Sequence, residues 1–262
     1  MLAPCMLLMA ACSGTPDRGL TAGYRLDSAT QGCRQRPDVC VRGAGEEALL
    51  PTLRPAEAVA SAVRTGAVVL RVLEATTRAV LERELKACAE HARSQVLVDH
   101  LGGRSPTRKE CNEEVDDAKS GRRITLAMQL GCVMHEVALA CVREALDEQI
   151  PGRFSLEQRY RFDPKSGALK LVSNEDVRSL LRMGCSDELT GTLVPDVVIH
   201  SGDPLEAEAI YDFKFPCMTI DATDWRQYPL GHPYAGNSQK QVYENALGAE
   251  ALRVLPRWGI LP

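Results

Sequence analysis

Two short segments combine carboxylates with a lysine in a pattern typical of phosphoryl chemistry. Pro195-Asp196 lies in an apolar run, and Asp212-Phe213-Lys214 lies in a second apolar run sixteen residues after Asp196. Residues two apart in a strand share a face, so Asp212 and Lys214 would point the same way, and a hairpin would bring Asp196 to them. Converging carboxylates suit Mg²⁺ or Mn²⁺, which would polarise a phosphoryl oxygen and activate a bound water beside Lys214. The alternative is that Asp212 and Lys214 are solvent-facing strand residues, but their apolar neighbours argue against it.

The surrounding sequence predicts the strands and helices that would position these residues. Residues 193–200 and 207–215 are typical of two strands, and Ser201-Gly202-Asp203-Pro204 between them is typical of a hairpin turn. Apolar periodicity and turn signals predict the remaining elements: helices over 56–98, 124–149, 174–183 and 238–250, and strands over 154–162, 169–172 and 252–260. The predicted fold class is therefore mixed α/β (α+β), preceded by a long helical segment.

With these elements in order, residues 124–262 resemble the PD-(D/E)XK nuclease superfamily, which has the restriction-endonuclease-like core of helix, three strands, helix and strand. Pro195-Asp196 and Asp212-Phe213-Lys214 carry the resemblance, with Asp212 where Glu is more usual. Gln239 and Tyr243 resemble the Gln-x-x-x-Tyr element of the RecB-like branch, and their spacing places them on one helix face. The resemblance implies that Asp196 and Asp212 bind the metal, that Lys214 assists the attacking water, and that Gln239 and Tyr243 orient the substrate.

The same family often adds an acidic residue or a histidine from its first helix. His135 and Glu136 both lie in the predicted helix over 124–149, and we predict that Glu136 completes the metal shell. Glu157, in the next predicted strand, is a weaker candidate for that role. His200 and His232 have no clear partner in the sequence, and we interpret them as ordinary loop or strand-end residues.

The N-terminus predicts export. Met9-Ala10-Ala11-Cys12 closes a short apolar run and resembles a bacterial lipobox, in which the cysteine is lipidated, although no Lys or Arg precedes the run. A plain secretory signal and an incidental apolar start are the alternatives. We predict a lipoprotein-type signal over 1–12 with lipidation of Cys12, an irregular leader over 13–55, a helical segment over 56–123 and a nuclease domain over 124–262.

Composition narrows the protein class. Of the 262 residues, 45% are hydrophobic and 25% charged, which excludes wholesale disorder and a multi-span membrane protein. The net charge of −4 predicts no broad basic surface, so any contact with phosphates needs a local site or a bound cation. With Cys5 and Cys12 set aside, eight of the ten cysteines remain, and an even number in an exported chain suggests disulfides; buried small apolar residues are the alternative for several of them. Cys33 and Cys40 are the easiest pair to credit, and the spacings do not suggest zinc.

The second half also resembles the restriction-endonuclease-fold toxin domains of bacterial polymorphic toxins. The combined prediction is a metal-dependent endonuclease, with DNA favoured over RNA. It would be an outer-membrane lipoprotein whose toxin domain acts in the cytoplasm of a neighbouring cell and whose cognate immunity protein is a further partner. One alternative is a non-catalytic surface lipoprotein that uses the same fold for binding, which the acidic balance favours slightly. Another is a hydrolase with a Cys or Ser nucleophile and His, but no Gly-x-Ser-x-Gly elbow is present.

Overall fold

The computed structural model describes residues 73–116, 123–218 and 224–262. The predicted signal with Cys12, the leader with Cys33 and Cys40, and the first part of the helix predicted from residue 56 lie outside the described residues.

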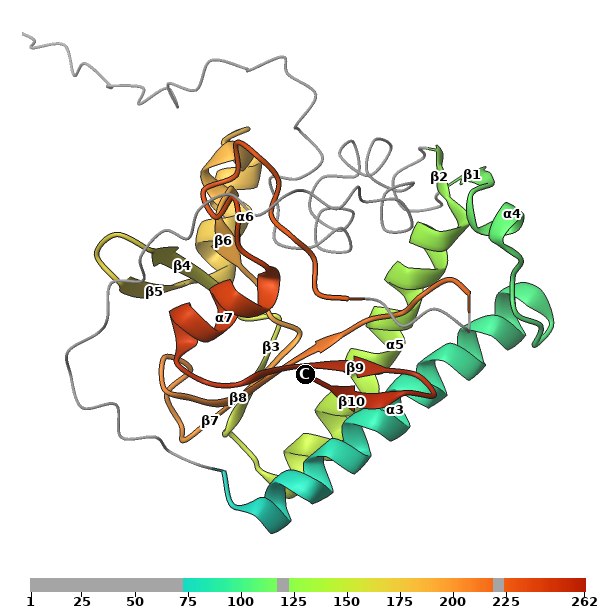
Figure 1. The fold of residues 1–262 in the computed structure, drawn as a ribbon, viewed down its shortest axis with the longest axis horizontal. Coiled ribbons are helices and arrows are strands. Elements are labelled where there is room, and N and C mark those ends of the chain that lie inside the picture. Colours follow the sequence, from blue (N-terminus) through green and yellow to red (C-terminus); the bar gives the residue numbers. More distant parts are fainter. Residues whose placement is uncertain (1–72, 117–122, 219–223) are drawn as a thin grey trace, which may run out of the picture.

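Two long helices, α3 (Ala75–Leu101) and α5 (Leu126–Gln149), pack against each other and against one face of the main sheet (Figure 1). The Thr125 side chain accepts the Met128 backbone N–H and so begins α5, and Gly102 ends α3 in the left-handed region, at φ 60°. A disulfide between Cys88 and Cys141 joins the two helices. By length and composition alone α5 could cross a membrane, but its buried side chains pack against α3 and the sheet, as those of a core helix do.

The main sheet has five strands in the order β10-β9-β8-β7-β3. All neighbouring strands are antiparallel except β8 and β9, which run parallel and are connected through helix α7 (Gln239–Leu247). The strands are β3 (Phe154–Leu156), β7 (Val197–His200), β8 (Ala207–Phe213), β9 (Ala251–Leu255) and β10 (Gly259–Leu261). Alternate residues of β8 separate two cores: Tyr211 and Phe213 face α3 and α5, whereas Ile210 faces α7.

A second, three-stranded sheet lies beside the first, in the order β5-β4-β6 (Figure 1). Its strands are β4 (Arg159–Asp163), β5 (Ala168–Val172) and β6 (Thr192–Leu193), with α6 (Asn174–Arg182) and the 3-10 helix η2 (Ser186–Leu189) between β5 and β6. At one end of α5 the chain forms the short helix α4 (Arg108–Cys111) and the antiparallel pair β1 (Glu114–Asp116) and β2 (Arg123–Thr125).

The mixed α-plus-β class is confirmed, and so are α5, α6, α7, the strand over 169–172 and the β7–β8 hairpin. Three predicted strands are wrong as single strands. Residues 154–162 divide into β3 and β4 at Glu157, whose φ of 50° turns the chain, and residues 193–200 divide into β6 and β7 at Pro195, which has no N–H for a ladder. Residues 252–260 form β9 and the start of β10. Each division moves the chain to another sheet or reverses it, so the main sheet receives only β3, β7, β8 and β9 between α5 and β10.

Candidate functional site

The pairing of β7 with β8 brings the two predicted aspartates together. Val197 is the register partner of Tyr211, so Asp196 and Asp212 are opposite each other one position further along and face the same way. Both carboxylates are buried, at 5% and 3% exposure. The Phe213 backbone N–H donates to Asp196 Oδ2 at 2.7 Å. Asp196 therefore converges on the Asp212-Phe213-Lys214 triplet, as the hairpin interpretation predicts.

From the other side, α5 contributes His135, which is buried at the same point. Its Nε2 lies 3.3 Å from Asp196 Oδ2 and 3.1 Å from the Phe213 carbonyl oxygen, and its Nδ1 lies 3.1 Å from the Gly131 carbonyl oxygen. Carbonyl oxygens only accept, so both ring nitrogens must carry protons and the ring is an imidazolium. Burial alone would lower the pKa of His135, but the charge of Asp196 and the hydrogen bond to it outweigh burial and raise that pKa to about 9.

Lys214 connects the carboxylates to helix α7. Its ammonium lies 2.6 Å from Asp212 Oδ2 and donates to Gln239 Oε1 at 2.8 Å. The Gln239 amide in turn donates to the Tyr243 hydroxyl at 2.9 Å, so this pair lies on one face of α7, as its spacing predicts. Lys214 Nζ also lies 5.6 Å from the ring centroid of Trp225, within cation–π range. Five of the six residues predicted for the site are therefore joined in one network of contacts.

The sixth, Glu136, is placed differently. Glu136 follows His135 in α5 and is half-buried. Successive residues of a helix are rotated by about 100° about its axis, so Glu136 does not lie on the face of α5 that presents His135 to Asp196. The family pattern leads us to predict Glu136 rather than His135. The feature that could have identified His135 as the site residue is its position among the apolar residues of a core helix. Glu157 lies at the turn between β3 and β4, where its backbone N–H donates to the Asp196 carbonyl oxygen at 3.0 Å. The predicted metal-binding role of Glu136 stays a prediction.

A serine–histidine pair lies on β3 and β7, where Ser155 Oγ is 3.0 Å from His200 Nε2. The Gly202 backbone N–H donates to His200 Nδ1 at 3.2 Å, so the neutral ring carries its proton on Nε2 and donates it to Ser155. A histidine in this tautomer cannot take the serine proton, and burial lowers its pKa. The pair therefore gives no support to a nucleophilic hydrolase. His232 stacks on Tyr228 in the loop before α7, at 4.5 Å between centroids.

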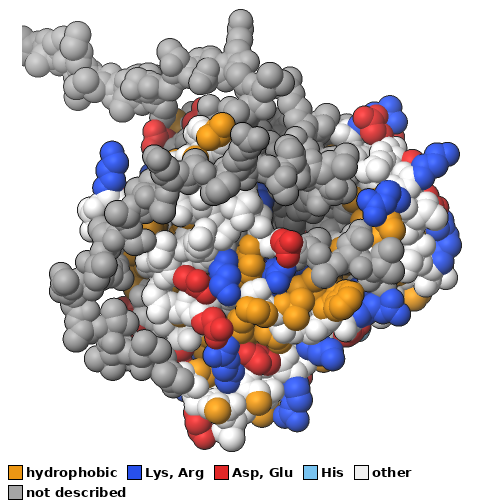
Figure 2. Space-filling model, in the orientation of Figure 1, with side chains coloured by type: hydrophobic (Ala, Val, Ile, Leu, Met, Phe, Trp, Pro, Cys, Tyr) orange, Lys and Arg blue, Asp and Glu red, His pale blue; other side chains and the backbone are white. Residues whose placement is uncertain are grey.

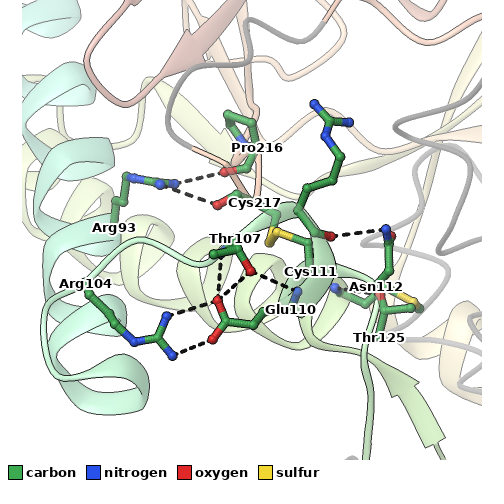
Figure 3. The surroundings of a disulfide bond; sticks show 11 residues. Arg93, Arg104, Thr107, Glu110, Cys111, Asn112, Thr125, Pro216 and Cys217 are labelled. Atoms are coloured by element: carbon green, nitrogen blue, oxygen red, sulfur yellow. Dashed lines mark hydrogen bonds and ion pairs between the residues drawn. A yellow bond between two sulfur atoms is a disulfide. The ribbon is translucent and has the colours of Figure 1, made fainter.

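The segment after Lys214 is fixed by a disulfide and a buried arginine (Figure 3). Cys217, three residues after Lys214, is bonded to Cys111 at the end of α4. Arg93 of α3 points at the same segment and donates to the carbonyl oxygens of Pro216 at 2.9 Å and Cys217 at 3.5 Å. In the same segment, the Phe215 ring contacts the His135 ring edge-on, at 5.0 Å between centroids. The segment after the triplet is thus held by groups far away in the sequence.

Comparisons with family models, with curated proteins and with solved structures found no match. Within the described residues, no group of three or more His, Cys, Asp or Glu side chains is arranged as a ready metal site. The carboxylates of the site are instead paired with protein groups: Asp196 contacts His135 and accepts the Phe213 N–H, and Asp212 contacts Lys214. Two buried anions are therefore balanced by two cations, in two adjacent pairs.

Proposed function

We propose that the chain is a metal-dependent nuclease that hydrolyses phosphodiester bonds. The observation that carries the proposal is the meeting of the buried Asp196 and Asp212 across β7 and β8, with Lys214 in contact with Asp212. Taking charged groups out of water is costly, and clusters of this kind are found preferentially where chemistry requires them.

The order of elements supports the resemblance to the restriction-endonuclease-like core. Helix α5, strands β3, β7 and β8, helix α7 and strand β9 succeed one another in that order, and β9 is parallel to β8. The three-stranded sheet, with α6, is then an insertion between β3 and β7.

The residues at the site fit a divalent cation by their donor chemistry. Asp196, Asp212, the Phe213 carbonyl and the His135 imidazole are oxygen and nitrogen donors of the kind that Mg²⁺ and Mn²⁺ accept. We propose His135, rather than Glu136, as the donor from α5, because its Nε2 already contacts Asp196 and the Phe213 carbonyl. A bound cation would supply charge stabilisation on the phosphoryl group and a more acidic water. Coordination through Nε2 requires the loss of its proton, so metal affinity should rise with pH.

Side chains of the protein would supply the remaining catalytic and positioning roles. Lys214 would stabilise charge on the phosphate or position the attacking water. Gln239 and Tyr243 would position Lys214: the Tyr243 hydroxyl orients the Gln239 amide, and the Gln239 oxygen accepts a hydrogen bond from the Lys214 ammonium. This positioning role adds to the substrate-orienting role that the resemblance implies.

The biological setting is part of the proposal. Two disulfides between described residues support an exported protein, because such bonds persist in oxidising compartments. With a lipidated Cys12, the chain would be an outer-membrane lipoprotein whose nuclease domain is a toxin handed to neighbouring cells. DNA is the favoured substrate and a cognate immunity protein the expected partner.

A non-catalytic binding lipoprotein is the second candidate. It is favoured by one observation: the charges of His135, Asp196, Asp212 and Lys214 are already balanced within the described site, so the network is stable as a purely structural element.

Cleavage by the full-length chain tests the proposal. Supercoiled plasmid, tRNA and total RNA would each be incubated with Mg²⁺ or Mn²⁺ and with EDTA. We expect metal-dependent cleavage that Asp212→Asn abolishes and Asp163→Asn, in an exposed turn, retains. Intact DNA and RNA under all conditions would contradict the nuclease and favour the binding protein, and so would cleavage that survives Asp212→Asn.

A further inference from the structure

The neighbouring strand places a largely buried arginine in register with Asp212. Arg253 of β9 is the parallel register partner of Asp212 and is 9% exposed. Its neighbours Leu252 and Val254 pack into the α3 and α5 core, so Arg253 itself points to the opposite face of the sheet. That is the face on which Lys214 contacts Gln239 of α7. Arg253 is therefore a further basic residue on the face of the sheet that carries Asp212 and Lys214.

The contacts of Arg253 differ in strength. Its Nη2 donates to the Pro262 carbonyl oxygen at 2.6 Å, which ties β9 to the residue after β10. Its Nη1 reaches Asp224 Oδ1 at 3.4 Å, and the Asp224 side chain is 100% exposed. A long ion pair to a fully exposed carboxylate is weak and screened by salt. Asp224 can therefore leave Arg253 when a stronger anion arrives.

The segment that carries Asp224 lies over the same face. Trp225 packs edge-on against Tyr243 and lies within cation–π range of Lys214, and the Arg226 carbonyl accepts the Gln239 backbone N–H at 2.7 Å. Asp224 thus reaches Arg253 from the chain segment that also contacts the Lys214, Gln239 and Tyr243 group.

The face of the molecule around β9 and β10 carries no broad basic area among its described residues. Figure 2 shows the face over β8, β9 and β10, on which basic and acidic side chains are mixed and no large area of one sign is present. A phosphate backbone that lies on this face would therefore be held by individual cations near the site. Arginine suits this task because its guanidinium is always charged and makes strong charge-assisted hydrogen bonds to phosphate oxygens.

We propose that Arg253 binds a backbone phosphate of the nucleic acid substrate beside the scissile one, and that Asp224 occupies its guanidinium until the phosphate replaces it. The inference rests on the proposed nuclease function and names one of its phosphate contacts. It makes opposite predictions for the two partners: loss of Arg253 weakens binding, whereas loss of the Asp224 charge strengthens it.

Binding of a short fluorescein-labelled duplex DNA, and of the matching single strand and RNA, tests the proposal. Fluorescence anisotropy would be measured with the full-length chain in EDTA, to prevent metal-dependent cleavage, across a series of salt concentrations. We expect Arg253→Gln to weaken binding by about 10- to 100-fold and to reduce the slope of log affinity against log salt by about one. Asp224→Asn should tighten binding by about 2- to 5-fold at low salt, and Arg253→Lys should recover part of the salt slope.

A matched pair outside the site provides the control. Arg123 and Glu114 form an exposed ion pair at 3.3 Å between β2 and β1, at the N-terminal end of α5 (Figure 1). Arg123→Gln and Glu114→Gln should leave both affinity and slope unchanged.

The outcomes separate the two claims. If the parent chain binds nucleic acid but Asp224→Asn leaves affinity unchanged, or Arg253→Gln leaves the salt slope unchanged, Arg253 only ties β9 to Pro262 and the inference is wrong. If the parent chain neither binds nor cleaves any nucleic acid, the proposed function fails, and the inference with it. The Asp224 variant keeps the test valid even if Arg253→Gln unfolds, because Asp224 is fully exposed.

Discussion

Among the residues that the structure describes, the Asp-x-Lys pattern occurs twice, in two regions with opposite environments. In Asp212-Phe213-Lys214, on the main sheet, the carboxylate is 3% exposed and contacts the ammonium at 2.6 Å. In Asp163-Pro164-Lys165, between β4 and β5, the carboxylate accepts from the Lys165 backbone N–H at 3.0 Å and from the Ser166 hydroxyl at 2.5 Å. These hydrogen bonds, that of Ser166 first, hold the pKa of the exposed Asp163 below its ordinary value.

The difference shows that residue types and spacing do not by themselves define a site. The second triplet is turn chemistry, in which an aspartate satisfies the backbone of its own loop. The first has its carboxylate and ammonium taken out of water and surrounded by groups from α5, β7 and α7. The contrast between a buried and an exposed triplet can be tested directly, because the molecule supplies its own control for each change.

The largest expected effect concerns the disulfide just beyond the buried triplet. The Cys111–Cys217 bond closes a separation of 106 residues, so its replacement by two serines should lower the free energy of unfolding by about 5 kcal/mol. Cleavage should fall as well, since the bond holds the segment after Lys214. The measurement is urea unfolding together with the rate of nucleic acid cleavage.

The Cys88–Cys141 bond closes 53 residues, and its removal should lower the free energy of unfolding by about 4 kcal/mol. The molecules that remain folded should lose less cleavage activity than those without the Cys111–Cys217 bond. Equal losses of activity in the two folded variants would contradict this distinction.

The second effect concerns the counter-charge of the buried histidine. Asp196→Asn leaves the His135 imidazolium buried beside a neutral amide, and breaking such a pair costs about 3–5 kcal/mol. Asp163→Asn weakens only exposed turn hydrogen bonds. Urea unfolding at pH 6 should therefore show that Asp196→Asn lowers the free energy of unfolding several-fold more than Asp163→Asn does. A loss for Asp196→Asn no larger than that for Asp163→Asn would show that the pair is not buried and charged.

The third effect is a pH dependence of stability. The pKa of His135 is about 9 in the folded chain, against an ordinary value of 6.5 for histidine, so the folded state binds the extra proton. Its contribution of about 3 kcal/mol is fully present below pH 6.5 and is lost as pH rises to 9. Chemical unfolding at a series of pH values in EDTA measures it, and His135→Gln should remove the slope. The pKa of His200 is lowered by burial, so its effect has the opposite sign and appears below pH 6.5. A flat profile between pH 6.5 and 9 would contradict the imidazolium.

Much of the fold can be predicted from local patterns. Helical periodicity locates α5 and α7, and the turn at residues 201–204 predicts the β7–β8 hairpin that brings Asp196 to Asp212. The strand divisions escape prediction because two-residue alternation continues through Glu157 and apolar residues lie on both sides of Pro195, and the chain changes sheet at both positions.

The rest of the site depends on tertiary placement. The choice between His135 and Glu136 depends on which face of α5 is buried, and His135 lies among the buried residues of that helix. The pairing of Cys111 with Cys217 joins α4 to the loop after β8, elements that no local pattern relates. Arg253 looks like an ordinary strand residue until β9 is aligned in parallel with β8.

Cleavage by two lysine variants tests the central claim most directly, because Lys214→Met and Lys165→Met change the same residue type at the same position of the two triplets. The full-length chain would be incubated with supercoiled plasmid and RNA in Mg²⁺ or Mn²⁺, and both variants checked for an unchanged fold by thermal unfolding. We predict that Lys214→Met slows cleavage by about 100- to 1,000-fold and that Lys165→Met cleaves like the parent. Equal rates for the two folded variants would show that the buried triplet does no chemistry.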